Sequence, residues 1–346
     1  MNNPLLVSQV RNEATKWALE NAKNYPEYAG VFFMGSILWY GGGEVWDDAS
    51  DVDIRILVRN YTDAHQHAGI DHKGFIIDLS FASIDELGPP DKILSDPFGA
   101  HNYFHNCIID DPLGLLSTLH EHVRKNFHRK KFVLDRLENL YRNSHAKLTR
   151  TRDGERNGFD VILGYSLGIR NLAALFAIYR LLNPSFRLCF PMARTALEKL
   201  GMGDEYPRML GLIADRKPPA NRVARMIENS RPFYENAVDI MTTPFWGNFY
   251  LVEGHGRHYF ASIESLLRDL NIIEALFVLV YKNYFIYKAI ELDGADELKK
   301  KNLAHMTELL ALADVNCLDD YKSRSTEALK LLDSTRCLLM ARINEG

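Results

Sequence analysis

The pattern of apolar and polar positions changes about one third of the way along the chain. In the first part, apolar residues recur at helical spacing over residues 7–24, and short apolar runs typical of buried strands occupy residues 31–34, 52–58, 74–81 and 107–109. The polar residues 59–73 are predicted to form a connection between two of these strands. This part of the chain is therefore expected to form a mixed β-sheet with flanking helices.

From residue 115 onward the periodicity is helical and almost no strand signal remains. The clearest helices are predicted at residues 160–183, 220–241, 261–292, 295–313 and 319–343, with a break allowed near Asn271 and a stop at Pro184. The predicted fold class is thus α+β, with a first domain at residues 1–114 and an all-helical domain at residues 115–346. A length of 346 residues agrees with two domains.

Composition and charge narrow the class of protein further. Apolar residues at 47% and charged residues at 25% are ordinary for a soluble globular protein. A net charge of −4 gives no support to nucleic-acid binding along the whole chain. The four cysteines form no CxxC pair, no basic stretch followed by an apolar run opens the sequence, and charges interrupt the apolar residues 272–290. We therefore expect reduced thiols, no membrane span and a cytoplasmic location.

Acidic residues at the predicted strands are the first candidate chemistry. Asp51 and Asp53 would share one face of a strand, with Cα atoms about 6.6 Å apart, while Val52 and Ile54 point into the core. A third acid, Asp78, lies in the middle of another predicted strand. If the two strands pair, the three carboxylates converge, and such a cluster is costly to bury unless divalent cations bind it. The pattern therefore predicts a site for Mg²⁺, with two ions expected.

A glycine-serine pair precedes these acids. Gly35 and Ser36 follow an apolar strand and lead into one or two predicted helical turns, so backbone N–H groups there could approach phosphate oxygens. Arg55 falls on the same strand face as Asp51 and Asp53. Arg55 could contact a triphosphate or form a structural ion pair, and the sequence leaves both open.

The order of these motifs resembles the nucleotidyltransferase superfamily with the DNA-polymerase-β-like catalytic fold. The matching motifs are Gly35-Ser36, Asp51-Val52-Asp53 and Ile77-Asp78-Leu79, and residues 50–53 and 108–114 look like the small antibiotic-modifying and antitoxin-type members. The resemblance covers about the first third of the chain. Residues 41–43, three glycines, lengthen the usual spacer, and Arg55 replaces a usual apolar residue.

The resemblance implies roles for individual residues. Asp51 and Asp53 would bind Mg²⁺ and the triphosphate, Asp78 would complete the metal site and help activate the acceptor hydroxyl, and Gly35 with Ser36 would hold the β- and γ-phosphates. The implied reaction transfers a nucleoside monophosphate, with AMP from ATP as the first choice, and releases pyrophosphate. The helical domain would supply acceptor specificity.

Several whole functions stay open at this point. The first is transfer to a hydroxyl of a small molecule such as an antibiotic. The second is adenylylation of a protein acceptor, and the third is a non-catalytic nucleotide-binding or partner-binding module. Neither the oligomeric state nor the base preference follows from the sequence.

Further polar residues of the first domain have an ordinary structural interpretation. Glu86 could act as a general base, but Ser83 and Glu86 have the spacing of a helix capping box, which is the preferred interpretation. Asp110 and Asp111 are expected to shape the turn before Pro112.

Four polar residues interrupt apolar helices of the second domain. Lys282 and Lys288 need a partner or a ligand, and extension of the ammonium group to the surface is the preferred interpretation. Arg170 and Asn171 either line a cleft or form buried hydrogen bonds. The sequence favours neither alternative for this pair.

Residues 247–259 are rich in glycine, histidine and aromatic residues. Such a segment could stack a base or cover a substrate, or it could simply connect two helices. His255 and His258 have i, i+3 spacing, but no further ligand is evident in the sequence, so metal binding by these histidines is disfavoured.

Overall fold

The computed structural model describes residues 4–62, 64–156, 158–183, 185–252 and 255–345. The chain divides into two compact units. The first comprises Met1–Arg136, Leu181–Ser185 and Val252–His258, and the second comprises Leu137–Arg180, Phe186–Leu251 and Tyr259–Gly346. The first unit thus extends past the predicted boundary at residue 114, and it includes a short segment from late in the sequence.

A five-stranded sheet with the order β3-β4-β2-β1-β5 forms the centre of the first unit. Its strands are β1 (Tyr28–Phe33), β2 (Val52–Val58), β3 (Ala68–His72), β4 (Phe75–Ser83) and β5 (Ile108–Asp110). β2 and β4 run parallel, whereas the other neighbouring pairs are antiparallel. This arrangement confirms the predicted mixed sheet.

The prediction that residues 59–73 only connect two strands was wrong, because β3 lies within them. Lys73 and Gly74 both have positive φ angles, of 49° and 92°, and form the tight turn that joins β3 to β4. Among the described strands β3 pairs only with β4 and forms the edge of the sheet, so its sequence does not need the apolar alternation of a central strand. The many polar residues of the stretch 59–73 left no recognisable strand pattern in the sequence.

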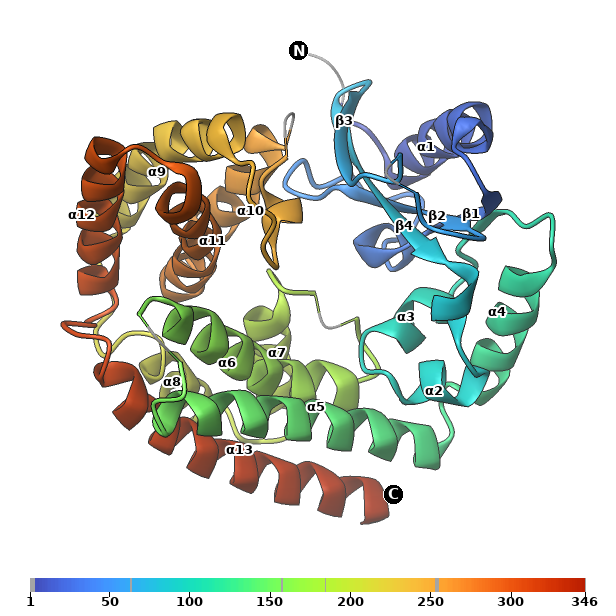
Figure 1. Ribbon diagram of the computed structural model, residues 1–346. Coiled ribbons are helices and arrows are strands. Elements are labelled where there is room, and N and C mark those ends of the chain that lie inside the picture. Colours follow the sequence, from blue (N-terminus) through green and yellow to red (C-terminus); the bar gives the residue numbers. More distant parts are fainter. Residues whose placement is uncertain (1–3, 63, 157, 184, 253–254, 346) are drawn as a thin grey trace. The chain divides into compact units, whose positions relative to one another are not determined.

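Short helices surround this sheet in Figure 1. They are α1 (Val7–Asn21), η1 (Ala22–Asn24), η2 (Gly35–Leu38), η3 (Ile84–Leu87), α2 (Pro90–Ser95), α3 (Gly99–Phe104) and α4 (Leu115–Asn126). Phe32 of β1 is fully buried, and its ring centroid lies 5.5 Å from that of Tyr103 of α3. Pro90 is the first residue of α2, a position that favours proline.

All regular elements described in the second unit are helices. They are α5 (Lys130–Arg152), which begins in the first unit, α6 (Asp160–Tyr179), α7 (Cys189–Lys199), α8 (Glu205–Gly211), α9 (Ala220–Ile240), η4 (Asn248–Tyr250), α10 (Gly256–Arg268), which also begins in the first unit, α11 (Ile272–Asp293), α12 (Asp296–Leu312) and α13 (Asp320–Glu345). The expected break near Asn271 is confirmed, since Leu270 has a φ of 61°. α6 ends earlier than predicted, and Pro184 lies outside the described residues.

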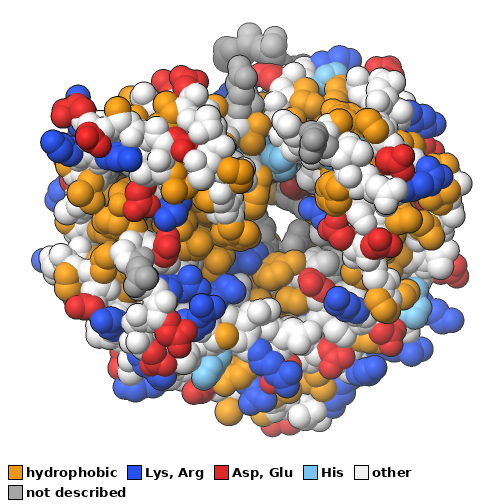
Figure 2. Space-filling model, in the orientation of Figure 1, with side chains coloured by type: hydrophobic (Ala, Val, Ile, Leu, Met, Phe, Trp, Pro, Cys, Tyr) orange, Lys and Arg blue, Asp and Glu red, His pale blue; other side chains and the backbone are white. Residues whose placement is uncertain are grey.

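Two apolar helices, α6 and α11, carry much of the core of the second unit. α6 is long and apolar enough to cross a membrane by length and composition, but 83% of its most apolar window is buried inside the protein, as in the core helix of a soluble protein. On the face that Figure 2 shows, acidic and basic side chains are interspersed, in keeping with the small net charge.

Candidate active site

Three aspartates meet at neighbouring positions of β2 and β4. Asp53 of β2 lies directly opposite Asp78 of β4 in the parallel pairing, and Asp51 immediately precedes β2. Val52 and Ile54 alternate with them and are completely buried, so the acids share the other face. One oxygen of each of the three carboxylates lies within 4.8 Å of the others. The strand pairing that the sequence argument required is therefore present.

The electrostatics of this cluster are those of crowded like charges. Burial, followed by the negative charges of Asp51 and Asp78, raises the pKa of the Asp53 carboxyl well above its usual range. Arg55 acts in the opposite direction, but it does not reverse the shift. Bringing all three carboxylates to their charged form is consequently unfavourable until a cation is present.

The backbone of Gly35 lies directly against the Asp53 carboxylate. Its φ of 66° is in the left-handed region, and a Cβ atom at this position would overlap the Asp53 carboxylate. The Gly35 N–H donates a hydrogen bond of 3.2 Å to the Asn102 side chain, and Ser36 is partly buried in the four-residue 3₁₀ turn η2. The expected glycine-serine turn is thus adjacent to the acids. Gly35 and Ser36 are the first two residues of the single 3₁₀ turn η2.

Arg55 has a structural partner within the sheet. Its Nε donates a 3.1 Å hydrogen bond to the Ser80 hydroxyl of β4, and Arg55 and Asp53 are both half-buried on the same face of β2. Contact with a nucleotide remains a prediction for Arg55.

Histidines surround the acids, and sequence reasoning missed their importance. His258 Nε2 lies 3.0 Å from Asp51 Oδ2, and His67 Nε2 lies 2.6 Å from Asp78 Oδ1. The ring centroid of His255 lies 5.9 Å from that of His67. His255 and His258 belong to the segment Val252–His258, which is part of the first compact unit. The spacing of His255 and His258 was the only signal in the sequence, because His67 falls in the unrecognised strand region.

The histidines also affect the charges of the cluster. Burial raises the pKa of Asp51, but the charge of His258 and its hydrogen bond to the carboxylate outweigh burial and hold that pKa below its usual range. Burial lowers the pKa of His255, against the opposing effect of the neighbouring carboxylates Asp78 and Asp51. A neutral imidazole is the form of histidine that binds metal ions.

The other acids of this unit have structural roles. The Ser83 hydroxyl accepts a hydrogen bond from Asp85 N–H, and Glu86 accepts one from Ser83 N–H, which confirms the preferred capping-box interpretation. Asp111 accepts hydrogen bonds from the first turn of α4, and Asp110 accepts one from the Tyr28 hydroxyl. Asp111 therefore holds the turn before α4, as predicted, whereas Asp110 is the last residue of β5 and binds Tyr28 of β1.

The polar residues singled out in the second unit have partners inside it. Lys282 Nζ donates to the Tyr259 carbonyl and the Ser262 hydroxyl, and Lys288 lies 3.1 Å from Glu291 and 3.6 Å from Asp160. Lys282 is thus partly buried, and its ammonium group binds acceptors inside the unit.

Arg170 and Asn171 contact each other. The Arg170 guanidinium donates to the Asn171 side chain, and it lies 5.6 Å from the ring centroid of Phe186. Of the two alternatives for this pair, the contacts favour buried hydrogen bonding.

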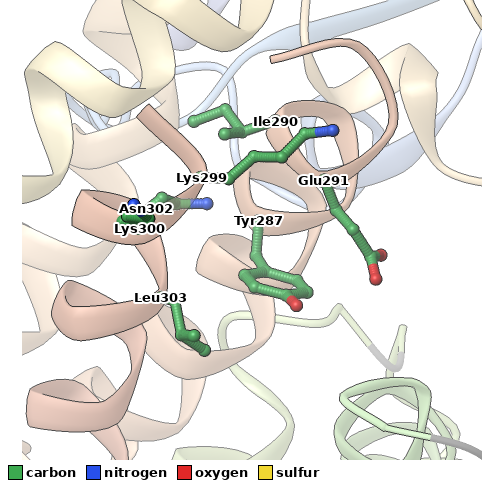
Figure 3. A pocket seen from close by; sticks show the side chains of 7 residues that line it. All are labelled: Tyr287, Ile290, Glu291, Lys299, Lys300, Asn302 and Leu303. Atoms are coloured by element: carbon green, nitrogen blue, oxygen red, sulfur yellow. The ribbon is translucent and has the colours of Figure 1, made fainter. Parts of the chain in front are cut away.

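A cavity of about 200 Å³ lies between α11 and α12 of the second unit (Figure 3). Its lining residues are Tyr287, Ile290, Glu291, Lys299, Lys300, Asn302 and Leu303. It is smaller than the roughly 300–1,000 Å³ of typical ligand pockets, and one lining residue is acidic. The aspartate cluster of the first unit is therefore the better candidate for an active site.

Comparison with known proteins gives a distant structural similarity. The chain is similar to a nucleotidyltransferase-like protein from Exiguobacterium sibiricum, whose crystal structure is known, with 14% sequence identity and a TM-score of 0.30 over 88% of this chain and 90% of that chain. No protein-family model and no curated protein matches the chain. A TM-score this low does not establish a shared function, so the chemistry has to be inferred from the residues of the site.

Proposed function

We propose that the protein is a Mg²⁺-dependent nucleotidyltransferase that transfers AMP from ATP to a hydroxyl group of a small molecule. The observation that carries this proposal is the meeting of Asp51, Asp53 and Asp78 within 4.8 Å on paired strands. Carboxylates clustered in this way suit phosphoryl-transfer chemistry, in which divalent ions contact the attacking and leaving oxygens.

The donor set fits Mg²⁺. Its ligands would be the carboxylate oxygens of Asp51, Asp53 and Asp78, the hard oxygen donors that Mg²⁺ prefers. Among the described residues, Asp78 Oδ1 is buried and accepts no hydrogen bond, and the pKa of Asp53 is raised by burial and by its acidic neighbours. Both observations are consistent with a site that a bound cation would stabilise. Bound Mg²⁺ would neutralise the developing charge on the triphosphate and on the leaving pyrophosphate.

The residues of the chain then have distinct tasks. The acceptor oxygen attacks the α-phosphorus of ATP, a new P–O bond forms, and the bond between the α-phosphorus and the bridging oxygen of pyrophosphate breaks. Asp78 takes the proton from the acceptor hydroxyl, and Asp51 and Asp53 would hold the Mg²⁺ that supplies positive charge to the triphosphate. Gly35 and Ser36 bind the β- and γ-phosphates, and Arg55 contacts the triphosphate from the same strand face as Asp53.

Transfer of label from α-³²P-ATP tests this function. The purified full chain is incubated with Mg²⁺, ATP and either aminoglycoside and other polyhydroxylated acceptors or candidate protein acceptors, and both pyrophosphate release and labelled product are measured. If the label appears on a protein acceptor, the acceptor in the proposed reaction is a protein and not a small molecule. ATP binding without pyrophosphate release would support the binding module and contradict the transferase.

Asp53→Asn is the decisive variant. An amide does not replace a metal-bound carboxylate, so transfer should fall by at least about 10³-fold, equivalent to about 4 kcal/mol of transition-state stabilisation. Asp71→Asn is the matched control, because Asp71 is an exposed acid on the neighbouring strand β3 and should retain full activity. Activity retained in Asp53→Asn would exclude the proposed metal-dependent mechanism.

A further inference from the structure

Two histidines and one of the aspartates form a second possible ligand set in the first unit. Each of His67, Asp78 and His255 offers one ligand atom, and these atoms lie within 4.8 Å of one another. His67 immediately precedes β3, Asp78 lies in the middle of β4, and His255 immediately precedes α10. All three belong to the same compact unit, so their geometry does not depend on the placement of the second unit.

The backbone of β3 leaves space for this cluster. Gly69 of β3 lies directly opposite Asp78 in the antiparallel pairing, and strand alternation places His67 on the same face as Gly69. A Cβ atom at position 69 would overlap the imidazole of His255. A glycine is therefore required at the point where His255 approaches the sheet.

Two of the polar atoms at this cluster, on His255 and Asp78, have no hydrogen-bond partner within the described part of the chain. His255 is only 6% exposed, and among the described residues neither its Nε2 nor Asp78 Oδ1 takes part in a hydrogen bond. His67 Nε2 lies 2.6 Å from Asp78 Oδ1, yet the approach does not have hydrogen-bond geometry. Buried polar atoms without partners are rare in native proteins, and a bound ion is one of their physical explanations.

The chemistry of the ligand set selects the kind of ion. Two imidazole nitrogens and one carboxylate oxygen suit divalent transition metals, and zinc sites with two histidines and one acid are known for this reason. Mg²⁺ instead prefers oxygen donors only. Ligands at about 2.0–2.1 Å from a tetrahedral zinc ion lie about 3.3 Å apart, so small side-chain movements would bring the three atoms into place.

We propose that His67, Asp78 and His255 bind one divalent transition-metal ion, with Zn²⁺ as the best fit, at a position that shares Asp78 with the acidic cluster. His258 is not part of this ligand set, because its Nε2 faces Asp51 at 3.0 Å. The proposal shares one residue with the proposed transferase site, but it concerns an ion bound in the absence of nucleotide.

Metal titration of the full chain tests the proposal. The protein is stripped with EDTA and dialysed, and Zn²⁺ is added in a calorimeter in millimolar Mg²⁺ without nucleotide. Co²⁺ titration in parallel gives visible absorption bands that report nitrogen and oxygen ligation. We expect one equivalent of Zn²⁺ to bind, and His67→Ala and His255→Ala should each weaken binding at least tenfold and alter the Co²⁺ spectrum.

A surface histidine provides the matched control. His122 lies 3.0 Å from Asp91 and is 39% exposed at its side chain, and within the described part of the chain this pair belongs to no group of three possible metal ligands. His122→Ala should leave Zn²⁺ affinity unchanged. If His255→Ala does not fold, as judged by circular dichroism, His255→Gln and Gly69→Ala replace it, and both should weaken binding.

Three results would overturn the proposal: no saturable Zn²⁺ binding above the level of Mg²⁺, unchanged affinity in both histidine variants, or an equal loss in His122→Ala. The outcomes are independent of the transferase test. Zinc binding that depends on His67 and His255 would stand even if Asp53→Asn showed that no transfer reaction exists, and its absence would leave the transfer reaction untouched.

Discussion

Buried charged groups chosen from each compact unit illustrate two opposite environments. In the second unit, Arg324 is 9% exposed and donates to the carbonyls of Ile213 and Asp314, and Glu274 is 4% exposed and accepts a 2.6 Å hydrogen bond from the Tyr206 hydroxyl. In the first unit, three carboxylates crowd together, and burial and mutual repulsion raise the pKa of Asp53.

This difference separates structural charges from functional ones. A buried charge whose donors and acceptors are satisfied within the fold stabilises it, and its removal leaves its partners without hydrogen bonds. A cluster of like charges destabilises the fold unless a ligand compensates for it, so its presence indicates binding. Removal of the Arg324 charge and removal of the Asp53 charge should therefore change the free energy of unfolding in opposite directions.

The largest effect is expected at Arg324. Arg324→Met keeps the volume of the side chain but leaves two carbonyl groups without donors, and it should lower the free energy of unfolding by about 2–4 kcal/mol. Arg225→Met is the control, because Arg225 is 60% exposed and lies 3.7 Å from Glu308, and it should cost less than about 0.5 kcal/mol. Urea unfolding followed by circular dichroism measures both. Equal losses in the two variants would contradict the assignment of Arg324 as a structural charge.

The next largest effect on stability is expected at Gly35, which lies against the Asp53 carboxylate. Gly35→Ala should cost about 2–3 kcal/mol, because it combines a φ of 66° with overlap of the Asp53 carboxylate. Gly114→Ala separates the two causes, since Gly114 has a φ of 69° with no atom within 4 Å of the added Cβ. It should cost only about 1 kcal/mol. Thermal unfolding measures the difference, and similar losses would show that Asp53 imposes no constraint on Gly35.

Much of the first unit could be predicted from local sequence. β2 spans the predicted residues 52–58, and alternation placed Val52 and Ile54 in the core and Asp53 outside it. The capping box at Ser83 followed from a three-residue spacing. These features depend on residues close together in the sequence, which is why the pattern was sufficient.

The histidines of the site could not be predicted in the same way. His67 lies beside an edge strand whose polar sequence gives no alternation, and His255 lies far along the chain in a segment that joins two helices. Only the pairing of β3 with β4 and the return of Val252–His258 to the first unit bring them to Asp78. Residues that come together only through tertiary structure leave no periodic pattern in the sequence.

The smallest expected effect is the gain in stability when the Asp53 carboxylate is removed. A raised pKa in the folded state means that the unfolded chain loses the Asp53 proton first, so the cost in stability is absent below the unfolded pKa of about 3.9, grows as the pH rises towards the folded value, and is complete above it. Asp53→Asn cannot ionise at this position. In EDTA it should therefore match the wild type near pH 4 and exceed it at pH 7 by about 1 kcal/mol, or about 1–2 °C in Tm.

Thermal unfolding at pH 4, 5.5 and 7 gives this comparison, with Asp71→Asn as a control whose difference from the wild type should not change with pH. Adding Mg²⁺ at pH 7 should stabilise the wild type and not Asp53→Asn, which reduces or reverses the order of the two Tm values. A variant that is less stable than the wild type in EDTA at pH 7 would show that the carboxylate of Asp53 is a structural charge like Arg324. The cluster would then have no need of a cation, and the distinction between the two units would fail.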